Sequence, residues 1–369
     1  MEESTIAAYE AGAVAWRDHR PARFLDRVEA LSARLADGDG IVADLGCGAG
    51  LHLPYLPRPA VALDASAAML DLVPEVAPEA WRVRADLAHL PFRRAALSGA
   101  WARASYLHVP STSLPWALME LHHALEVDGA AHLTMLRGDE DGPQPDDEYP
   151  GRFFARWQPD RLSDQLTGAG LDVLELVVDR TEEHWLHALV RRARTLPDVV
   201  GPGMRLLLCG LNPSVYSADA GVGFARPGNR FWPAATSSGL LTTTRDARDA
   251  YVRHAVGMTD LVKRATARAD ELAPDEYRAG AARVERLVHW LRPGAICFVG
   301  LSGYRVAVDR RATAGVQDEP FGGVPAYVMP NPSGLNAHTS PADLAEHLRA
   351  AARLADDARS RESDPSAVH

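Results

Sequence analysis

The sequence predicts an α/β protein of two domains, each built on a mostly parallel sheet. Three observations lead to this prediction. The chain has 369 residues, more than one hydrophobic core usually organises. Short apolar runs alternate with helix-like segments, which is the pattern of a parallel sheet covered on both faces. Charge, proline and glycine interrupt this pattern at residues 191–204, after which it begins again.

The first half alternates strands and helices. The predicted strands are IVADL (41–45), VALDA (61–65), WRVRADL (81–87), ALSGAWARA (96–104), GAAHLTML (129–136), LDVLELVVD (171–179) and EHWLHALV (183–190). The predicted helices are residues 66–76, 115–127 and 158–170. We expect the acidic, proline-broken stretch at 139–148 to be a solvated loop, with a cover over a nearby site as the alternative.

The second half repeats the alternation with different glycine signatures. Its predicted strands are RLLLCG (205–210), AICFVG (295–300) and PAYVMP (325–330). Three helices are also predicted: one that begins near Arg230, one that ends near Pro293 and one that begins near Pro341. The expected organisation is a domain over 1–195, a linker over 196–203, a domain over 204–355 and a frayed polar tail over 356–369.

Composition narrows the class of protein. Hydrophobic residues make up 47% and charged residues 24%, which excludes a mostly disordered chain. Cys47, Cys209 and Cys297 lie far apart without a C-x-x-C pair, so we expect neither a disulfide framework nor a metal site. The N-terminus lacks the features of a signal peptide and no apolar run is long enough to span a membrane. We therefore expect a cytoplasmic location.

The net charge of -10 is unevenly distributed. Residues 1–197 carry 19 Arg or Lys against 30 Asp or Glu, whereas residues 198–369 carry 20 against 19. The first half should therefore be repelled by nucleic acid, while the second half permits its binding.

A glycine loop follows the first predicted strand. Asp44 precedes Gly46, Gly48 and Gly50, and Asp64 ends the next strand 20 residues after Asp44. Glycines allow a tight turn and close approach of a ligand, and a carboxylate at this distance can accept hydrogen bonds from ribose hydroxyls. An NAD fingerprint would read G-x-G-x-x-G, whereas these glycines run G-x-G-x-G. The segment resembles motif I of the class I S-adenosylmethionine-dependent methyltransferases, over roughly residues 30–195.

This resemblance implies S-adenosylmethionine as the cofactor of a Rossmann-like domain. Asp44 then lies near the methionine end, the three glycines line the cofactor, and Asp64 holds the ribose. Asp86 and Leu87 resemble the segment beside the adenine, and residues 98–110 resemble the strand and turn that close the pocket. The methyl acceptor is not identified. No D-P-P-Y, N-P-P-Y or Pro-Cys motif occurs in this half, and the candidate bases are His108, His122 and His123.

Three predicted strand ends in the second half are rich in glycine, proline and asparagine. They are Gly210-Leu211-Asn212-Pro213, residues 300–303 (GLSG) and residues 331–336 (NPSGLN). Open α/β sheets build their sites at this edge, and exposed backbone amides suit a planar polar ligand. The alternative is three ordinary turns.

These residues resemble the mismatch-specific uracil/thymine-DNA glycosylases of the uracil-DNA glycosylase superfamily. The motifs are G-x-N-P, F-A-x-P-x-N-R-F-W, G-M-T-D-L-V and N-P-S-G-L, within about residues 198–355. The resemblance implies base flipping and hydrolysis of the N-glycosidic bond of uracil opposite guanine, more weakly of thymine, without a lyase step or cofactor. Ethenocytosine is a further candidate base, and double-stranded DNA is the implied partner.

The resemblance also assigns residues. Asn212 is the catalytic asparagine that orients a water, Phe224 stacks on the flipped base, and Ser217 lies near the C5 edge of the base. Leu335 is the wedge that fills the gap in the duplex, and Asn336 lies beside the widowed guanine. The remaining implied substrate-binding residues are Gly210, Leu211, Asn331 and Gly334.

Two positions depart from the family pattern, because Ser214 replaces a usual glycine and Ala337 replaces an arginine found in some relatives. The candidate phosphate contacts are Arg226, Arg230, Lys263, Arg264 and Arg268. Two other readings stay open: the methyltransferase is the main activity beside a DNA- or base-binding module, or both halves are binding modules.

Overall fold

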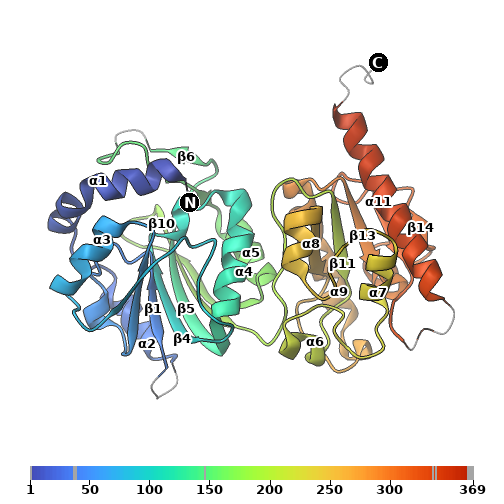
Figure 1. Cartoon of the computed structure of the whole chain (residues 1–369), viewed down its shortest axis with the longest axis horizontal. Coiled ribbons are helices and arrows are strands. Elements are labelled where there is room, and N and C mark those ends of the chain that lie inside the picture. Colours follow the sequence, from blue (N-terminus) through green and yellow to red (C-terminus); the bar gives the residue numbers. More distant parts are fainter. Residues whose placement is uncertain (1, 36–39, 145–146, 335, 337–338, 364–369) are drawn as a thin grey trace. The chain divides into compact units, whose positions relative to one another are not determined.

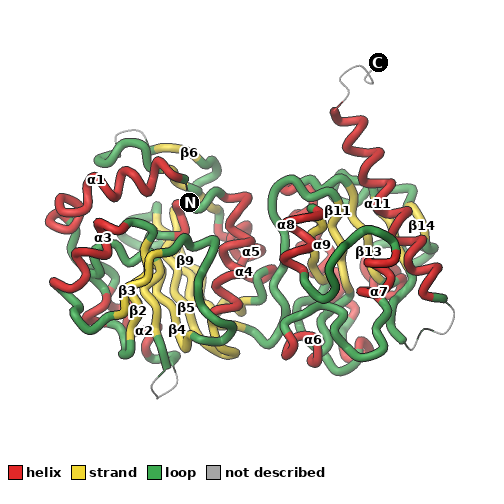
Figure 2. The backbone as a smooth tube through the Cα atoms, in the orientation of Figure 1, coloured by secondary structure: helices red, strands yellow, loops and turns green. Residues whose placement is uncertain are grey.

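The computed structural model describes residues 2–35, 40–144, 147–334, 336 and 339–363 (Figure 1). The chain forms two compact units, Met1–Ala193 and Arg194–His369. In each unit the strands form a layer with helices packed against it (Figure 2). Within the described part of the chain, no helix is long and apolar enough to cross a membrane.

The N-terminal unit contains one large mixed sheet and a separate two-stranded sheet formed by β6 and β7. Its strands are β1 (Val42–Leu45), β2 (Ala60–Asp64), β3 (Trp81–Arg84), β4 (Leu97–Arg103), β5 (Leu125–Arg137), β6 (Gly142–Pro143), β7 (Phe153–Phe154), β8 (Arg156–Trp157), β9 (Leu171–Val178) and β10 (Trp185–Arg192). Its helices are α1 (Glu3–His19), α2 (Leu25–Ser32), α3 (Ala67–Leu72), α4 (Leu114–Ala124) and α5 (Pro159–Gly168). The strand order is β3-β2-β1-β4-β5-β10-β9, with β8 paired to β5.

The predicted α/β class is confirmed, but one edge of this sheet is not parallel. Strands β1 to β5 pair in parallel, whereas β10 is antiparallel to both β5 and β9. Residues 179–184 between β9 and β10 are too few for a crossover helix, so the two strands form a hairpin. Asp179 stabilises this turn by accepting the backbone N–H groups of Thr181 and Glu182.

The C-terminal unit is a second, smaller α/β layer. Its strands are β11 (Leu206–Gly210), β12 (Val256–Asp260), β13 (Ala295–Val299), β14 (Gly315–Val316) and β15 (Ala326–Met329). Its helices are α6 (Val215–Ala220), α7 (Phe231–Ser237), α8 (Ala247–His254), α9 (Pro274–Leu291), α10 (Leu301–Ala307) and α11 (Pro341–Ser363). The order is β12-β11-β13-β15-β14, parallel except for β14.

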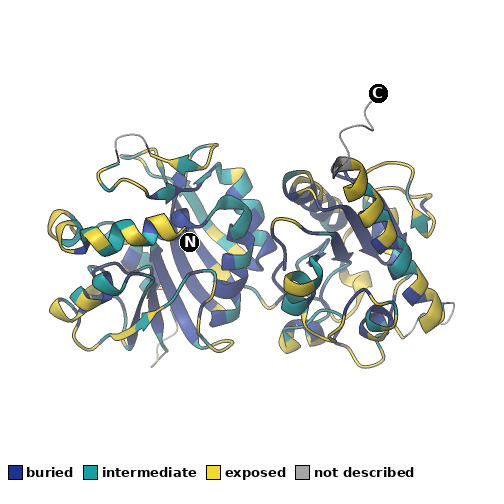
Figure 3. Cartoon of the chain, turned by 45° about the horizontal axis from the view of Figure 1, so that its top comes forward, coloured by how far each residue is buried: buried dark blue, intermediate teal, exposed yellow. Residues whose placement is uncertain are grey.

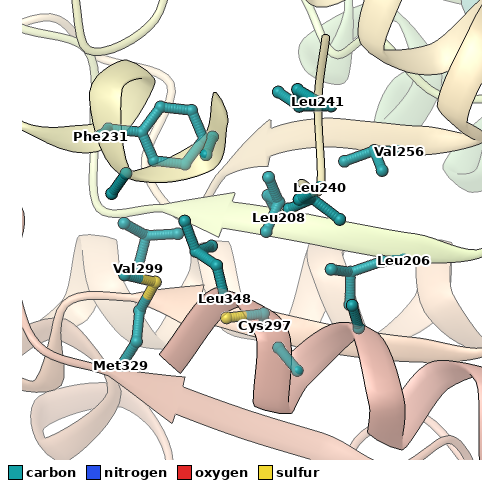
Figure 4. Packing of buried hydrophobic residues seen from close by; sticks show 14 of the residues in the cluster. Leu206, Leu208, Phe231, Leu240, Leu241, Val256, Cys297, Val299, Met329 and Leu348 are labelled. Atoms are coloured by element: carbon teal, nitrogen blue, oxygen red, sulfur yellow. The ribbon is translucent and has the colours of Figure 1, made fainter. Parts of the chain in front are cut away.

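Alternating side chains of β11 fix the two faces of this sheet. Leu206 and Leu208 join a core with Phe231 of α7 and Leu348 of α11 (Figure 4). Leu207 and Cys209 join the opposite core, which includes residues of α9 and α10. Because every residue of β11 is buried, the strand is rigidly held and delivers the loop after Gly210 to a fixed place. The buried strands and partly exposed helices are visible in Figure 3.

Several parts of the chain differ from the sequence-based expectation. Residues 196–203, expected as a linker, pack into the C-terminal unit, where Val199 pairs with Met258 and Asp198 is buried. The tail expected to fray from residue 356 continues α11 to Ser363, and Asp356 pairs with Arg205 at 2.6 Å. Helix α1 and strand β12 were not expected at all.

Candidate functional site

The glycine loop after β1 forms a tight cradle in the N-terminal unit. Gly46 and Gly48 have φ values of +74° and +53°, which side chains rarely adopt. A Cβ at Gly46 would overlap Ser105, and one at Gly48 would lie 3.1 Å from the Trp16 ring. These two glycines are therefore required by both backbone conformation and space.

Asp64 at the end of β2 is held against this loop. Its Oδ2 accepts the backbone N–H of Gly48 at 2.8 Å, and its Oδ1 accepts that of Ser66 at 2.8 Å. Burial raises the pKa of Asp64 despite these hydrogen bonds. Each carboxylate oxygen has a second lone pair, so the group can also accept ligand hydroxyls.

Asp44 is a buried carboxyl group that lines the cradle. It is 2% exposed, and its buried Oδ2 has no hydrogen-bond partner among the residues that the structure describes. Burial and the neighbouring Asp64 raise the pKa of Asp44 to about 8. A buried carboxyl without a partner is costly, and a cationic ligand group would stabilise its ionised form. The cradle and this orphaned oxygen fit the cationic end of S-adenosylmethionine.

A cavity of about 420 Å³ opens over the loop. Among the predicted cofactor residues, those that line it are Asp44, Gly46, Gly48, Asp64 and Leu87. Gly50 and Asp86 are not among the lining residues. A Cβ at Gly50 would lie 2.8 Å from Leu53, so this glycine serves packing beneath the loop. Asp86 Oδ1 accepts the backbone N–H of Ala88 at 2.8 Å.

Only one of the three candidate histidine bases lines the cavity. His108 Nδ1 donates to the Phe153 carbonyl at 2.6 Å, which leaves Nε2 to accept the Tyr9 hydroxyl at 2.8 Å. Burial lowers the pKa of His108 to about 4, so the ring is neutral. Its lone pair is directed at Tyr9, and it positions that hydroxyl. His122 and His123 lie on α4, outside the lining residues.

Much of the cavity wall was not found from the sequence. Tyr9, Trp16 and Arg20 come from α1 and the residue after it, and Arg103 ends β4. The acidic stretch, expected to be solvated, contributes Asp147 and Glu148 to the wall. Arg103 lies in residues 98–110, the segment expected to close the pocket, whereas the other residues belong to no motif and only the tertiary fold brings them to the wall.

Asn212 in the C-terminal unit is held by its amide nitrogen. Its Nδ2 donates to Thr266 Oγ1 at 2.8 Å, to the Arg264 carbonyl at 2.9 Å and to the Pro213 carbonyl at 3.2 Å. Because three acceptors surround the two N–H bonds, the amide has one orientation. Its Oδ1 consequently points away from these partners and accepts no hydrogen bond within the described residues, so it is the group that could orient a water.

The segment after β12 provides these acceptors because it runs beside the Asn212 loop. The Leu261 N–H donates to the Gly210 carbonyl at 3.0 Å, and the Thr266 N–H donates to the Pro213 carbonyl at 3.2 Å. The sequence G-M-T-D-L-V at 257–262 is this strand and its exit. The segment extends the sheet pairing past the end of β11 and fixes Asn212.

Asp260 at the end of β12 belongs to the G-M-T-D-L-V motif, but the sequence analysis assigned it no role. A Cβ at Gly210 would overlap its Oδ1, so the absence of a side chain at Gly210 makes room for this carboxylate. Burial raises the pKa of Asp260 to about 6, and the Lys263 ammonium opposes that shift. Asp260 is thus a carboxyl that titrates near neutral pH beside the strand end that carries Asn212.

A buried ion network supports this segment from behind. The Asp198 carboxylate accepts Lys263 Nζ at 2.8 Å, Arg283 Nη1 at 2.7 Å and Thr259 Oγ1 at 2.7 Å. Lys263 is therefore committed to the protein interior, which corrects its assignment as a phosphate contact.

Ser214 and Ser217 order the turn that carries Phe224. Ser214 Oγ caps α6 by accepting the Ser217 N–H at 3.1 Å, so the side chain that replaces a usual glycine has a structural use. Ser217 is 3% exposed, and its oxygen accepts the Ala225 N–H at 3.2 Å.

Phe224 itself is held in an unusual conformation. Its φ is +56°, and its ring stacks on Phe231 with centroids 4.1 Å apart. Non-glycine residues with positive φ are uncommon and need support from their surroundings. The half-buried Phe224 ring is therefore a preformed aromatic platform near Gly210.

The loop after β15 is clamped by Arg230. Its guanidinium donates to the carbonyls of Thr339 at 2.6 Å, Asn336 at 2.7 Å and Ser333 at 2.9 Å. A Cβ at Gly334 would lie 2.7 Å from the Gly228 carbonyl oxygen. Arg230 is therefore a loop clamp, which corrects its assignment as a phosphate contact.

The other predicted residues of this loop have local partners. Asn331 is exposed, and its Oδ1 accepts the Ser333 N–H. Asn336 Nδ2 donates to the Asn331 carbonyl at 2.9 Å. Leu335 and Ala337 lie outside the described residues.

The remaining candidate phosphate contacts differ from one another. Arg264 pairs with Glu276 at 2.7 Å and Arg268 with Asp270 at 2.7 Å, both at the surface. Arg226 is exposed. Within the described ranges, no group of three or more His, Cys, Asp or Glu side chains could hold a metal ion.

Comparison with known proteins supports a division into two kinds of domain. Residues 42–129 match the family model described as "Methyltransferase domain", and residues 197–354 match the "Uracil DNA glycosylase superfamily" model. The chain therefore contains a methyltransferase domain and a domain of the uracil DNA glycosylase superfamily.

Solved structures similar to this chain match about half of it. A chain of the complex between the Haloferax volcanii Trm112 methyltransferase activator and a methyltransferase is 16% identical, with a TM-score of 0.40, over 52% of this chain and 99% of that one. The DhpI–SAH complex is 22% identical, with a TM-score of 0.41, over 52% and 96%. A Burkholderia thailandensis 1,6-didemethyltoxoflavin-N1-methyltransferase is 18% identical, with a TM-score of 0.41, over 51% and 85%.

Proposed function

We propose that the C-terminal unit is a monofunctional DNA glycosylase of base-excision repair that removes uracil, and more weakly thymine, from mismatches with guanine. Ethenocytosine is a further candidate base. We also propose that the N-terminal unit is a methyltransferase that uses S-adenosylmethionine. The observation that carries the glycosylase proposal is the anchored Asn212 amide, whose three acceptors leave its Oδ1 free.

The proposed excision begins with a base flipped from the duplex. Opening a mismatched pair costs less than opening a matched one, which favours G:U over A:U before any contact with the base. The Phe224 platform would stack on the flipped base, an interaction worth roughly 1–3 kcal/mol. Because the ring is already stacked on Phe231, little conformational entropy is lost when the base arrives.

Hydrolysis then requires a water aimed at the sugar C1′. Asn212 Oδ1 would accept one hydrogen of this water and orient its lone pair toward C1′. The C1′–N bond breaks with its electrons on the base, the water oxygen bonds to C1′, and the water's proton passes to Asp260 or to solvent. The Asp260 carboxylate would also stabilise positive charge developing at the sugar.

DNA binding by this unit should be weak and dependent on salt. Lys263 pairs with the buried Asp198, and Arg230 binds carbonyl groups of the loop after β15. Arg264 and Arg268 already have acidic partners at the surface. Surface ion pairs are worth little, so these two arginines can exchange a carboxylate for a phosphate. Few phosphate contacts mean low affinity that falls further with added salt.

Uracil release from defined duplexes tests the glycosylase proposal. The full chain is incubated at low salt with a duplex containing one G:U pair, and with matched G:T, A:U and ethenocytosine duplexes. We expect release that is fastest from G:U. Gln317→Ala serves as the control variant, because it alters an amide near the distant strand β14. Binding of the G:U duplex without release from any of these duplexes would instead support a DNA-binding module.

The methyltransferase proposal depends on the cradle in the N-terminal unit. Asp64 would hold the ribose hydroxyls, and Asp44 would face the cationic end of the cofactor. When bound, the cofactor supplies an electrophilic methyl group that an acceptor's electron pair attacks. Calorimetric binding of S-adenosylhomocysteine tests this proposal, and lack of binding would refute it.

A further inference from the structure

The cavity in the N-terminal unit is larger than its cofactor cradle. Beyond the glycine loop, Leu107, Leu136 and Phe154 form an apolar cluster, with Ala104 and Trp185 packed against it. All five residues line the cavity. This wall suits the apolar body of a second ligand.

The charged part of the same wall contains four arginines, of which three have carboxylate partners. Arg20 pairs with Glu148 at 2.7 Å. Arg23 pairs with Glu182, and Arg152 pairs with Asp147. The six charges of these pairs cancel, so they leave no net charge for a ligand to neutralise.

Arg103 is the exception. Within the described residues its guanidinium makes no hydrogen bond or ion pair, and its Nε is buried without a partner. Its guanidinium carbon lies 5.6 Å from the centre of the Phe24 ring. Burial, together with Arg23 and Arg20, lowers the pKa of Arg103 to about 10, although Asp44 and Tyr9 oppose this shift, so the group is still charged at neutral pH.

We propose that this cavity binds, as methyl acceptor, a small carboxylic acid with an apolar body, whose carboxylate accepts hydrogen bonds from Arg103. A cation removed from water without a partner is costly, and an arginine fork matches a carboxylate in shape. Asp44 and Asp64 line the same cavity, but within the described residues neither pairs with Arg103, so a ligand carboxylate would give this guanidinium its hydrogen-bond acceptor. This inference rests on the proposed binding of S-adenosylmethionine, and it names the class of the second substrate.

A carboxylate could also come from the methionine end of the cofactor. The two sources make different predictions. If Arg103 held the cofactor's carboxylate, its removal would weaken S-adenosylhomocysteine but not 5′-methylthioadenosine, which lacks that group. If Arg103 holds the acceptor, its removal leaves the affinity for both nucleosides unchanged.

The experiment is calorimetry on the full chain at low salt. The protein is first titrated with S-adenosylhomocysteine and with 5′-methylthioadenosine. The protein saturated with S-adenosylhomocysteine is then titrated with matched acids and amides: 4-hydroxybenzoate and 4-hydroxybenzamide, indole-3-acetate and indole-3-acetamide, and 4-phenylbutyrate and 4-phenylbutyramide. The variants are Arg103→Met and, as control, Arg180→Met, whose arginine is exposed and outside the cavity wall.

We expect at least one acid to bind about 10-fold or more tightly than its amide, since hydrogen bonds to charged groups are strong. Arg103→Met should abolish this preference while leaving S-adenosylhomocysteine binding unchanged, and Arg180→Met should change neither. If the protein binds S-adenosylhomocysteine but prefers no acid over its amide, the inference about the acceptor is overturned and the proposed function is not. Selective loss of S-adenosylhomocysteine affinity in Arg103→Met would also overturn that inference. Failure of wild type to bind S-adenosylhomocysteine would instead refute the proposed function.

Discussion

Replacing Asn212 by aspartate keeps the shape of the side chain but replaces its donor nitrogen with an oxygen. If only base strength mattered, the aspartate would be the better activator of water. The structure predicts the opposite, because the nitrogen faces the carbonyl oxygens of Arg264 and Pro213 at 2.9 and 3.2 Å. Only Thr266, whose hydroxyl can rotate and donate, tolerates an oxygen in that place.

The expected loss follows from these contacts. Two hydrogen bonds disappear, each worth about 0.5–1.5 kcal/mol. Their combined loss of about 1–3 kcal/mol corresponds to a rate about 5- to 150-fold slower. The facing carbonyls also disfavour the charged form, so they raise the pKa of the introduced carboxyl. Protonation restores a donor, and activity relative to wild type should therefore recover as the pH falls.

The assay is single-turnover uracil release from a G:U duplex, measured from about pH 6 to about pH 9. Asn212→Ala gives the rate that remains without the amide, and thermal unfolding checks that the variants are folded. An Asn212→Asp enzyme as fast as wild type across this range would refute the reasoning that the amide nitrogen must be held by acceptors.

Three other predictions follow from the same contacts. Arg230→Met removes the clamp on Ser333, Asn336 and Thr339 and should slow uracil release from bound DNA by about 10-fold. Arg226→Met should instead weaken DNA binding and its salt dependence without slowing that step. Equal effects of the two variants in both assays would contradict the clamp. Asp64→Asn should weaken S-adenosylhomocysteine binding by about 10- to 100-fold in calorimetry, and the exposed Asp71→Asn should not. Burial lowers the pKa of His52 and His108 to about 4 and of His132 to about 3, so below the unfolded value of about 6.5 the unfolded chain binds protons that the folded unit does not. Stability therefore falls as the pH falls from about 6.5 toward 4, by up to about 3 kcal/mol for each histidine. Circular dichroism should show acid unfolding in this range that His132→Phe shifts to lower pH, and an unchanged midpoint would contradict the assignment.

The elements of this fold that could be predicted are those with a clear local sequence pattern. The strands β1, β2, β11 and β13 are short apolar runs, with a glycine directly after β1 and β13 and at the end of β11, and the structure has them where the sequence indicated. Strand β12 was missed because V-G-M-T-D has a glycine inside it and little alternation. Its place is decided by pairing with β11, which a local pattern does not contain. Helix α1 was missed because its apolar face is interrupted, and much of its stability comes from docking on α3, where Glu10 accepts two N-terminal amides.

The candidate sites divide in the same way. Glycines and loop asparagines could be predicted because conformation or chemistry restricts those positions to few residue types. Asp260 and Arg103 lie in segments that the sequence analysis singled out, but neither could be given a role, because an aspartate or arginine at a strand end is an ordinary residue until its neighbours are known. Lys263 and Arg230 show the converse error. Their charge indicated phosphate binding, whereas the fold brings them to Asp198 and to three carbonyl groups.

The most direct test of the central proposal is the release of free uracil from a G:U duplex by the full chain under single-turnover conditions. Wild type is predicted to release it, and Asn212→Ala to be slower by about 100-fold or more, because water positioning is lost while DNA binding is kept. Equal rates for the two proteins, or no release by wild type at low salt, would contradict the account.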